Sequence, residues 1–358
     1  MKYPTKLNNS LRFIDLFCGI GGFRVAMEKA CLAFGIDAEC LFSSDIDAEC
    51  HKAYAANFEE KPKGDITKIE AREIPDHDIL LAGFPCQPFS IIGHMKGFED
   101  TRGTLFFEIA RILQEKKPKS FVLENVKLLV GHNGGKTLAQ IMETLRKLGY
   151  HADYRVFNAI EFGLPQKRER VFIVGFKDHC HFNWPEGKIP MTPLSKILEK
   201  NVSPKYYASD YIKKKRWSQL EPTKEPTIWH ENKAGHISAY PYSCALRAGA
   251  SHNYLLVNGE RRLTPREMLR LQGFPDSYKI ECPDSQIKKQ AGNSLPVPVA
   301  QAIIRNVIEA CGISACAERK ETKYSAINGQ LQCFEESARY NERTKNKNRR
   351  KIQTSIST

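Results

Sequence analysis

Cys86 lies where a reactive thiol would be held rigidly. It stands between Pro85 and Pro88 in the stretch Gly83–Ser90, directly after the apolar run Ile79–Ala82. Each proline fixes its own φ and restricts the residue before it, so the turn is stiff. A cysteine that attacks a substrate must be partly exposed and able to ionise. Considered alone, this cysteine is more typical of a buried apolar thiol.

Charged residues that could assist such a thiol follow at two places. Glu124 ends the apolar run 120–124, and a carboxylic acid there could protonate or orient a substrate. Arg168 and Arg170 stand in the stretch 166–170, just before another apolar run, and guanidinium groups stabilise developing negative charge. Taken singly, each is more typical of a strand-end cap or a surface charge.

A glycine-rich turn, residues 18–22, follows the first apolar run of the chain. Glycines at such a point let the backbone approach a ligand at the head of a helix. The pattern GxGxxG is absent, which argues against a dinucleotide. Asp45 ends the second predicted strand and could accept hydrogen bonds from ribose hydroxyls. Asp65, at the end of the next predicted strand, could face the same crevice, so the three places together predict a nucleoside site.

Alternating strands and helices are expected to position these residues. Strands separated by helical segments predict an α/β fold with a mostly parallel sheet covered on both faces. Ligands bind such sheets at the carboxyl ends of the strands, which is where the residues above fall. The predicted strands are 12–17, 40–44, one ending at Asp65, 78–82, 120–124 and 170–176, and the predicted helices are 24–30, 105–113 and 137–148.

The alternation stops where a segment punctuated by seven prolines, 177–260, begins. We predict a second, smaller, loop-rich domain there. A helix should follow from Thr264, because threonine suits the N-cap, Pro265 the first position and Glu267 the reciprocal capping contact. A closing helix is predicted over 298–310.

The net charge of +13 over 358 residues favours an anionic partner, of which nucleic acid is the commonest large one. Part of the excess lies in 313–358, with ten Lys/Arg against five Asp/Glu. That tail is polar and aperiodic, so we expect disorder. The run 213–216, Lys-Lys-Lys-Arg, is predicted to contact phosphates, which position a duplex without specifying its sequence.

Cysteine usage and hydropathy exclude several classes of protein. Eleven cysteines without a CxxC pair argue against a disulfide framework and against a zinc site, so we expect no metal. No apolar run approaches the roughly 20 residues that span a bilayer, and we expect no membrane partner. Polar residues follow the basic start of the chain where a signal peptide would be apolar. The prediction is a cytoplasmic protein.

Together and in this order, these stretches resemble the 5-methylcytosine (C5) DNA methyltransferases, particularly the bacterial restriction–modification type. The Pro-Cys-Gln element with a downstream Glu-Asn-Val is the most specific part. The resemblance covers roughly residues 11–176 and 261–310. The matching stretches are 13–24, 83–90, 124–126, 166–170, 262–267, 272–275 and 292–294.

The resemblance implies a Rossmann-like S-adenosylmethionine-dependent methyltransferase sheet with a smaller target-recognition domain. It divides the chain into a catalytic and cofactor-binding domain (1–176), a target-recognition domain (177–275), a return segment that packs on the catalytic domain (276–312) and the basic tail (313–358). The implied cofactor is S-adenosyl-L-methionine and the implied partner is double-stranded DNA. We expect a monomer.

The resemblance also implies catalytic roles. The thiolate of Cys86 would add to C6 of a flipped-out cytosine, while Glu124 protonates or hydrogen-bonds N3 and Arg168 holds O2, with Arg170 beside it. The loop 87–102 would act as a lid.

Cofactor contacts are implied residue by residue. Phe17 and Asp65 would contact the adenine, Asp45 the ribose, and Asn293 with Ser294 the methionine end. Relatives often carry Glu and an aromatic residue where this chain has Asp45 and Ile46, so stacking on the adenine should be weaker here. The other cofactor-lining positions implied are Gly19, Gly21, Ile46, Ile66, Pro85 and Leu105.

Two alternatives are weighed against DNA methylation. A related tRNA cytosine-5 methyltransferase would carry a Cys-Phe-Thr element and a short recognition region, whereas this chain lacks that element and has the long segment 177–260. A catalytically inactive DNA-binding relative would not need Cys86, Glu124 and Arg168 intact. The sequence therefore predicts a DNA (cytosine-5-)-methyltransferase that protects host DNA from a cognate restriction enzyme.

Overall fold

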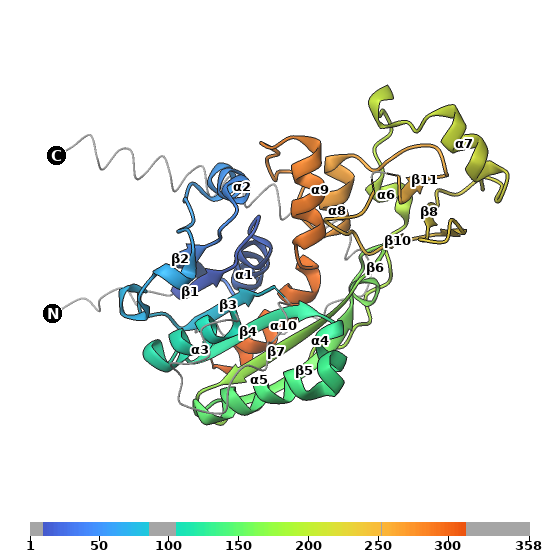
Figure 1. The fold of residues 1–358 in the computed structure, drawn as a ribbon. Helices are drawn as coiled ribbons and strands as arrows, with labels where there is room; N and C mark the ends of the chain where they lie inside the picture. Colours follow the sequence, from blue (N-terminus) through green and yellow to red (C-terminus); the bar gives the residue numbers. More distant parts are fainter. Residues whose placement is uncertain (1–9, 86–104, 252, 313–358) are drawn as a thin grey trace, which may run out of the picture.

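The computed structural model describes residues 10–85, 105–251 and 253–312. At its centre lies a six-stranded sheet with the order β2-β1-β3-β4-β7-β5 (Figure 1). Parallel pairing joins β2, β1, β3 and β4, and β7 runs antiparallel to both of its neighbours. The predicted mostly parallel α/β sheet is confirmed. Its strands are β1 (Ser10–Leu16), β2 (Asp37–Ser44), β3 (Ile79–Gly83), β4 (Ser120–Val126), β5 (His151–Asn158) and β7 (Glu169–Phe176).

Helices cover both faces of this sheet, which explains why its inner strands are almost wholly apolar. In β3, Leu81 packs with one cluster of core residues and Leu80 with the other, as the twofold alternation of a strand requires. Helices α1 and α10 share the first cluster, and α3 and α5 share the second (Figure 1). These helices span Gly22–Ala33 (α1), Leu105–Lys116 (α3), Lys136–Lys147 (α5) and Val297–Ala310 (α10), and α2 spans Ala48–Phe58.

One expectation for the sheet was wrong, and one strand was not predicted. No strand of the described chain ends at Asp65. The backbone there forms a short 3₁₀ turn, Ile66–Lys68, which Asp65 caps, and an isolated bridge joins Lys63 to Ser44. The sheet also includes β5, which the sequence did not reveal because half of its residues are exposed on the sheet edge. A strand exposed in this way lacks the apolar run by which buried strands are recognised.

The proline-punctuated segment contains a small antiparallel sheet, β11-β8-β9, joined by loops. Its strands have three or four residues each, too few for a periodic pattern to be read from sequence. The strand β10 pairs in parallel with β6, which stands just before β7 in the chain, so the two parts of the molecule meet there. The elements are β6 (Gln166–Lys167), α6 (Leu194–Ile197), α7 (Asp210–Trp217), β8 (Ile228–Glu231), β9 (Ile237–Tyr240), β10 (Ser243–Cys244) and β11 (Leu255–Val257).

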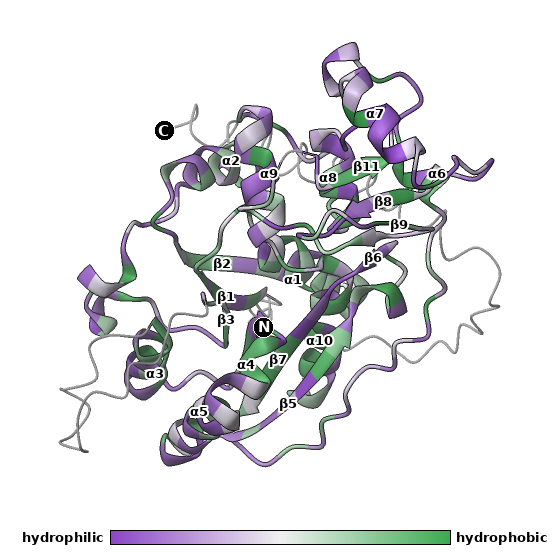
Figure 2. Ribbon diagram, turned by 45° about the vertical axis from the view of Figure 1, so that its right-hand side comes forward, coloured by the Kyte–Doolittle hydropathy of each residue, from purple (hydrophilic) through white to green (hydrophobic). Residues whose placement is uncertain are grey.

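The run 213–216 lies on α7, a helix dominated by hydrophilic residues (Figure 2). The expectation that all four side chains face phosphates was wrong. Arg216 is fully buried, and its guanidinium donates to the carbonyl oxygens of Trp229 and Asn253 and to the carboxylate of Glu231. A helix with one buried face must turn one of four consecutive residues inward. The three lysines remain at the surface.

The helix predicted after Thr264 is confirmed as α8 (Pro265–Leu271). The side chain of Thr264 accepts from the backbone N–H of Glu267, whose carboxylate in turn accepts from the N–H of Thr264. Arg261 donates to both carboxylate oxygens of the buried Glu267, at 2.9 and 2.8 Å. The sequence did not reveal the next helix, α9 (Asp284–Asn293).

The closing helix α10 packs against α1, so the end of the described chain returns to the first strands of the sheet. Within the described ranges, no helix combines the length and the hydropathy needed to cross a membrane.

Candidate cofactor and catalytic pocket

A cavity of about 540 Å³ opens where β1, β2, β3 and β4 end. This size suits a small-molecule ligand, and the carboxyl ends of parallel strands are where α/β sheets bind ligands. The end of α9 closes the cavity from the other side. The predicted residues that line it are Phe17, Gly19, Asp45, Ile46, Asp65, Ile66, Pro85, Leu105, Glu124, Arg170, Asn293 and Ser294.

The glycine turn after β1 is shaped by three positive φ angles, at Phe17 (55°), Gly19 (53°) and Gly21 (79°). Gly19 lines the cavity and has open space around it. Gly21 does not line the cavity, because it faces Phe58: a Cβ there would lie 2.3 Å from the ring. Side-chain packing thus accounts for this glycine, and its expected contact with the cofactor stays a prediction.

Asp45 is oriented by backbone donors on both of its carboxylate oxygens. Gly19 N–H donates to one oxygen and Asp47 N–H to the other, each at 2.8 Å. A carboxylate accepts about four hydrogen bonds, so lone pairs stay available toward the cavity. The next residue, Ile46, has an exposed fraction of 78% and lines the rim. Together they offer an oriented acceptor beside an apolar surface.

Asp65 lines the same cavity, although it is held by a 3₁₀ turn and not by a strand. One carboxylate oxygen accepts from the backbone N–H and the hydroxyl of Thr67, at 3.0 and 2.8 Å. These two hydrogen bonds lower the pKa of Asp65, which keeps the carboxylate ionised. An ionised acceptor suits an amino group.

Glu124 and Arg170 form an ion pair at the inner end of the cavity. Val126 lies opposite Arg170 and Glu124 opposite Phe172 in the antiparallel pairing of β4 with β7, so Glu124 and Arg170 share one face of the sheet. Arg170 Nε lies 2.8 Å from Glu124 Oε1. Burial raises the pKa of Glu124, and the neighbouring arginines partly offset this rise. A proton can therefore be held there at a higher pH than on a free glutamate.

Arg168 does not belong to the cavity. Its side chain is fully buried, and its guanidinium donates to the carbonyl oxygens of Leu246, Gly292 and Ser294 at 2.9, 2.9 and 2.5 Å. Arg168 lies between β6 and β7 and belongs to neither strand. The alternation of side chains along a strand therefore does not place it on the same face as Arg170. The expected contact between Arg168 and a base was therefore wrong.

Other residues of the site had no recognised role in the sequence. Asn125 donates from Nδ2 to the carbonyl of Phe84 at 2.9 Å, which ties β4 to the segment leading to Cys86. In the sequence, the position of Asn125 in the stretch Glu-Asn-Val could have indicated a role in the site. Lys289 of α9 pairs with Asp47 at 2.7 Å on the cavity rim. No local sequence pattern predicts this contact.

The predicted nucleophile, Cys86, and the predicted lid 87–102 lie outside the described residues, as does the basic tail. The described chain stops at Pro85 and resumes at Leu105, and both of these residues line the cavity.

Comparisons with known proteins identify the family of the chain. The family model for C-5 cytosine-specific DNA methylase matches residues 11–309. The chain is 57% identical over 294 residues to the Type II methyltransferase M.NgoBI of Neisseria gonorrhoeae, covering 81% of this chain and 90% of that protein. It is 54% identical over 306 residues to M.HaeII of Haemophilus aegyptius, covering 84% and 94%.

Solved structures share the fold at lower identity. The Dnmt2 methyltransferase of S. pombe matches with a TM-score of 0.63 and 21% identity, covering 84% of this chain and 98% of that one. A putative DNA modification methyltransferase encoded within an E. coli prophage matches with a TM-score of 0.66 and 19% identity, covering 84% and 99%. On the family match and the curated relatives, the chain belongs to the C-5 cytosine-specific DNA methylases.

Proposed function

We propose that this protein transfers the methyl group of S-adenosylmethionine to C5 of a cytosine in a specific duplex sequence. The observation that carries the proposal is one cavity that joins a nucleoside-binding edge, at Asp45 and Asp65, to the Glu124–Arg170 pair. Its relatives at 54–57% identity are named Type II methyltransferases. This supports a role in protecting host DNA from a cognate restriction enzyme. We further propose that the protein works as a monomer in the cytoplasm, where bacterial DNA lies.

The residues of the cavity fit S-adenosylmethionine. Asp45 can accept from ribose hydroxyls, Asp65 from the adenine amino group, and Phe17 with Ile46 can cover the adenine faces. A Cβ on Gly22 would lie 3.0 Å from the hydroxyl oxygen of Ser294. Glycine therefore leaves room around the expected methionine end of the cofactor. When bound, the cofactor supplies a methyl group activated by a sulfonium.

The chain's own residues account for the activation of the cytosine. We infer that the Cys86 thiolate adds to C6, which places electron density on C5 and makes it nucleophilic. Glu124 holds a proton toward N3, and Arg170 takes the O2 contact first expected of Arg168, because Arg170 lines the cavity. After methyl transfer a base removes the C5 proton and the C6–sulfur bond breaks, which regenerates the thiolate.

Duplex bases are stacked, so the cytosine must be flipped out before this chemistry can occur. We propose that residues 1–176 form the catalytic domain with the return segment 276–312, and that 177–275 recognise the target. The lysines of α7 are proposed to contact phosphates, and the tail 313–358 to add nonspecific affinity.

Methylation-sensitive sequencing of a plasmid that expresses the gene tests this function. We expect C5-methylated cytosines at one defined sequence and none with Cys86→Ser. Unmodified plasmid together with newly methylated tRNA would instead support the tRNA alternative. An absence of methylation on both substrates would reject methyl transfer.

Replacing Asp45 by Ala should raise the cofactor KM far more than it lowers turnover at saturating cofactor. The lost charge-assisted hydrogen bonds should cost roughly 1.5–3 kcal/mol of binding, about a ten- to hundredfold change in affinity. Steady-state kinetics at varied cofactor concentration measure this split. The matched control is Asp37→Ala, at the exposed start of β2, which should leave KM unchanged; an unaltered KM in Asp45→Ala would remove Asp45 from the site.

A further inference from the structure

Arg168 joins two segments that are far apart in the sequence. Its guanidinium donates to the carbonyl of Leu246, in the loop after β10, and to the carbonyls of Gly292 and Ser294, at the end of α9. Gln166 holds the same loop by accepting from the N–H of Leu246 at 3.0 Å. Leu246 lies in the proposed target-recognition domain, and Ser294 lines the cofactor cavity. One buried cation therefore bridges the two regions.

The same two segments also touch directly. A Cβ on Gly292 would lie 2.4 Å from the backbone nitrogen of Ala248, so α9 and the loop approach at a distance that only glycine allows. One helical turn earlier, Lys288 donates to the carbonyl oxygens of Ala250 and Ser251. Helix α9 thus presents Asn293 to the cofactor cavity and Lys288 to the loop.

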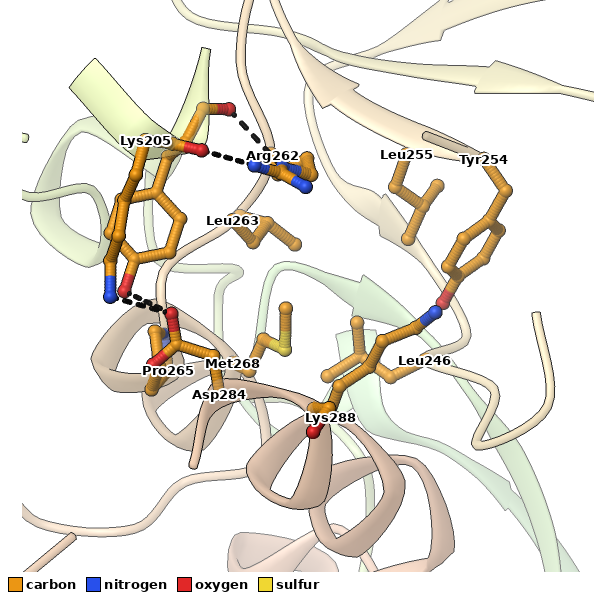
Figure 3. Close-up of a pocket in the computed structure, with 12 residues that line it drawn as sticks. Lys205, Leu246, Tyr254, Leu255, Arg262, Leu263, Pro265, Met268, Asp284 and Lys288 are labelled. Atoms are coloured by element: carbon orange, nitrogen blue, oxygen red, sulfur yellow. Dashed lines mark hydrogen bonds and ion pairs between the residues drawn. The ribbon is translucent and has the colours of Figure 1, made fainter. Parts of the chain in front are cut away.

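Lys288 also lines a second cavity, of about 300 Å³, between α9 and the recognition region. Figure 3 shows its side chain extending from α9 toward Leu246 and Tyr254. The loop and the helix enclose space here, and the hydrogen bonds of Arg168 and Lys288 join these two segments. Movement of either segment would strain the hydrogen bonds of the other.

We propose that Arg168 is a positioning residue that couples cofactor binding to DNA binding by holding the Leu246 loop and the end of α9 in one arrangement. The inference rests on the proposed function, since it assumes that these two ligands bind. Coupling of this kind is reciprocal: if the cofactor tightens DNA binding by some factor, DNA tightens cofactor binding by the same factor. Removing the bridge should reduce both factors together.

A second buried arginine offers a matched control. Arg216 is also fully buried and also donates to backbone carbonyls, those of Trp229 and Asn253. All of its partners, including Glu231, lie within the recognition region. Its loss should lower stability as much as the loss of Arg168 does, without affecting communication between the two regions.

The experiment compares wild type, Arg168→Met, Arg168→Lys, Lys288→Met and Arg216→Met, each checked for folding by thermal melting. The dissociation constant of a duplex carrying the mapped target is measured with and without saturating S-adenosylhomocysteine, the demethylated product. The converse titration measures S-adenosylhomocysteine with and without duplex. For wild type we expect the same factor in both directions, roughly tenfold.

Arg168→Met should bring that factor close to one and weaken S-adenosylhomocysteine binding about tenfold, because three buried carbonyls lose their donor. Arg168→Lys should restore part of the factor, and Lys288→Met should lose part of it. Arg216→Met should melt earlier and keep the full factor. If Arg168→Met does not fold, the two milder substitutions, Arg168→Lys and Lys288→Met, decide the test.

Three results would overturn the proposal: a wild-type factor of one, full coupling in every substitution of Arg168 and Lys288 that folds, or equal loss in Arg216→Met. Failure of the proposed function is distinguishable from these, because wild type would then lack specific binding of the duplex, with or without S-adenosylhomocysteine, or would not bind S-adenosylhomocysteine at all.

Discussion

Cys86→Ser should lower turnover by a factor on the order of 10⁴ or more while leaving DNA binding within about twofold of wild type. A serine hydroxyl is a far weaker nucleophile at neutral pH than a partly ionised thiol. Base flipping and target readout do not require the sulfur, so affinity for the duplex should persist. Single-turnover methyl transfer and duplex titration of the same preparations measure the two effects.

Fluorine at C5 of the target cytosine turns this expectation into a covalent test. The thiolate can still add to C6 and the methyl group can transfer to C5, but no C5 proton is left to remove. The carbon–sulfur bond should then persist, giving a protein–DNA complex that survives denaturant and forms only with S-adenosylmethionine present.

The chain offers a matched control for this trapping experiment. Cys50 has a thiol that lines the cavity, yet this residue is buried, and burial raises the pKa of its thiol. A thiol that does not ionise is a poor nucleophile. Cys50→Ser should therefore trap normally and Cys86→Ser not at all; trapping that survives the loss of Cys86 would place the nucleophile elsewhere.

Glu124→Gln should lower turnover roughly 10²–10⁴-fold, the usual contribution of a positioned acid. Protonated Glu124 is the form that donates to N3, and burial raises the pKa of this carboxyl. The active form is thus fully present at low pH and is lost as pH rises through the raised pKa. The wild-type rate should fall over that range, whereas Glu124→Gln, whose side chain does not titrate, should have a low rate that lacks this fall.

Glu169→Gln is the control for this pH profile. Glu169 precedes Arg170 on β7, and its carboxylate pairs with Lys127 at 2.8 Å away from the cavity. Its replacement should leave both rate and profile unchanged. A pH profile that stayed wild-type in Glu124→Gln would show that another group supplies the proton.

Much of this site follows from local sequence. The prolines around Cys86, the glycines after β1 and the acidic residue after β2 are each recognised from a few neighbouring residues of the sequence. The helix start at Thr264 is likewise a contact between residues three positions apart, Thr264 and Glu267. Apolar runs of sufficient length identified β1, β3, β4 and β7, because strands buried on both faces need no polar residues.

Tertiary structure decided the matters that depend on which surfaces meet. Arg168 and Arg170 are the same residue type in one short stretch, so the local sequence does not distinguish their roles. In the structure Arg170 pairs with Glu124 across β4 and β7, whereas Arg168 donates to the carbonyl oxygens of Leu246 and Gly292. Gly21 resembles a ligand-binding glycine in sequence. In the structure, a Cβ at this position would clash with the ring of Phe58, which accounts for the glycine.

The same holds for elements that owe their form to long-range contacts. Asp65 reaches the cavity from a 3₁₀ turn, and Lys289 reaches Asp47 across 242 positions of chain. Burial and hydrogen-bond partners of this kind are set by packing between distant segments. Residue type and local spacing determine what chemistry a side chain can do, whereas the fold determines which partner it meets.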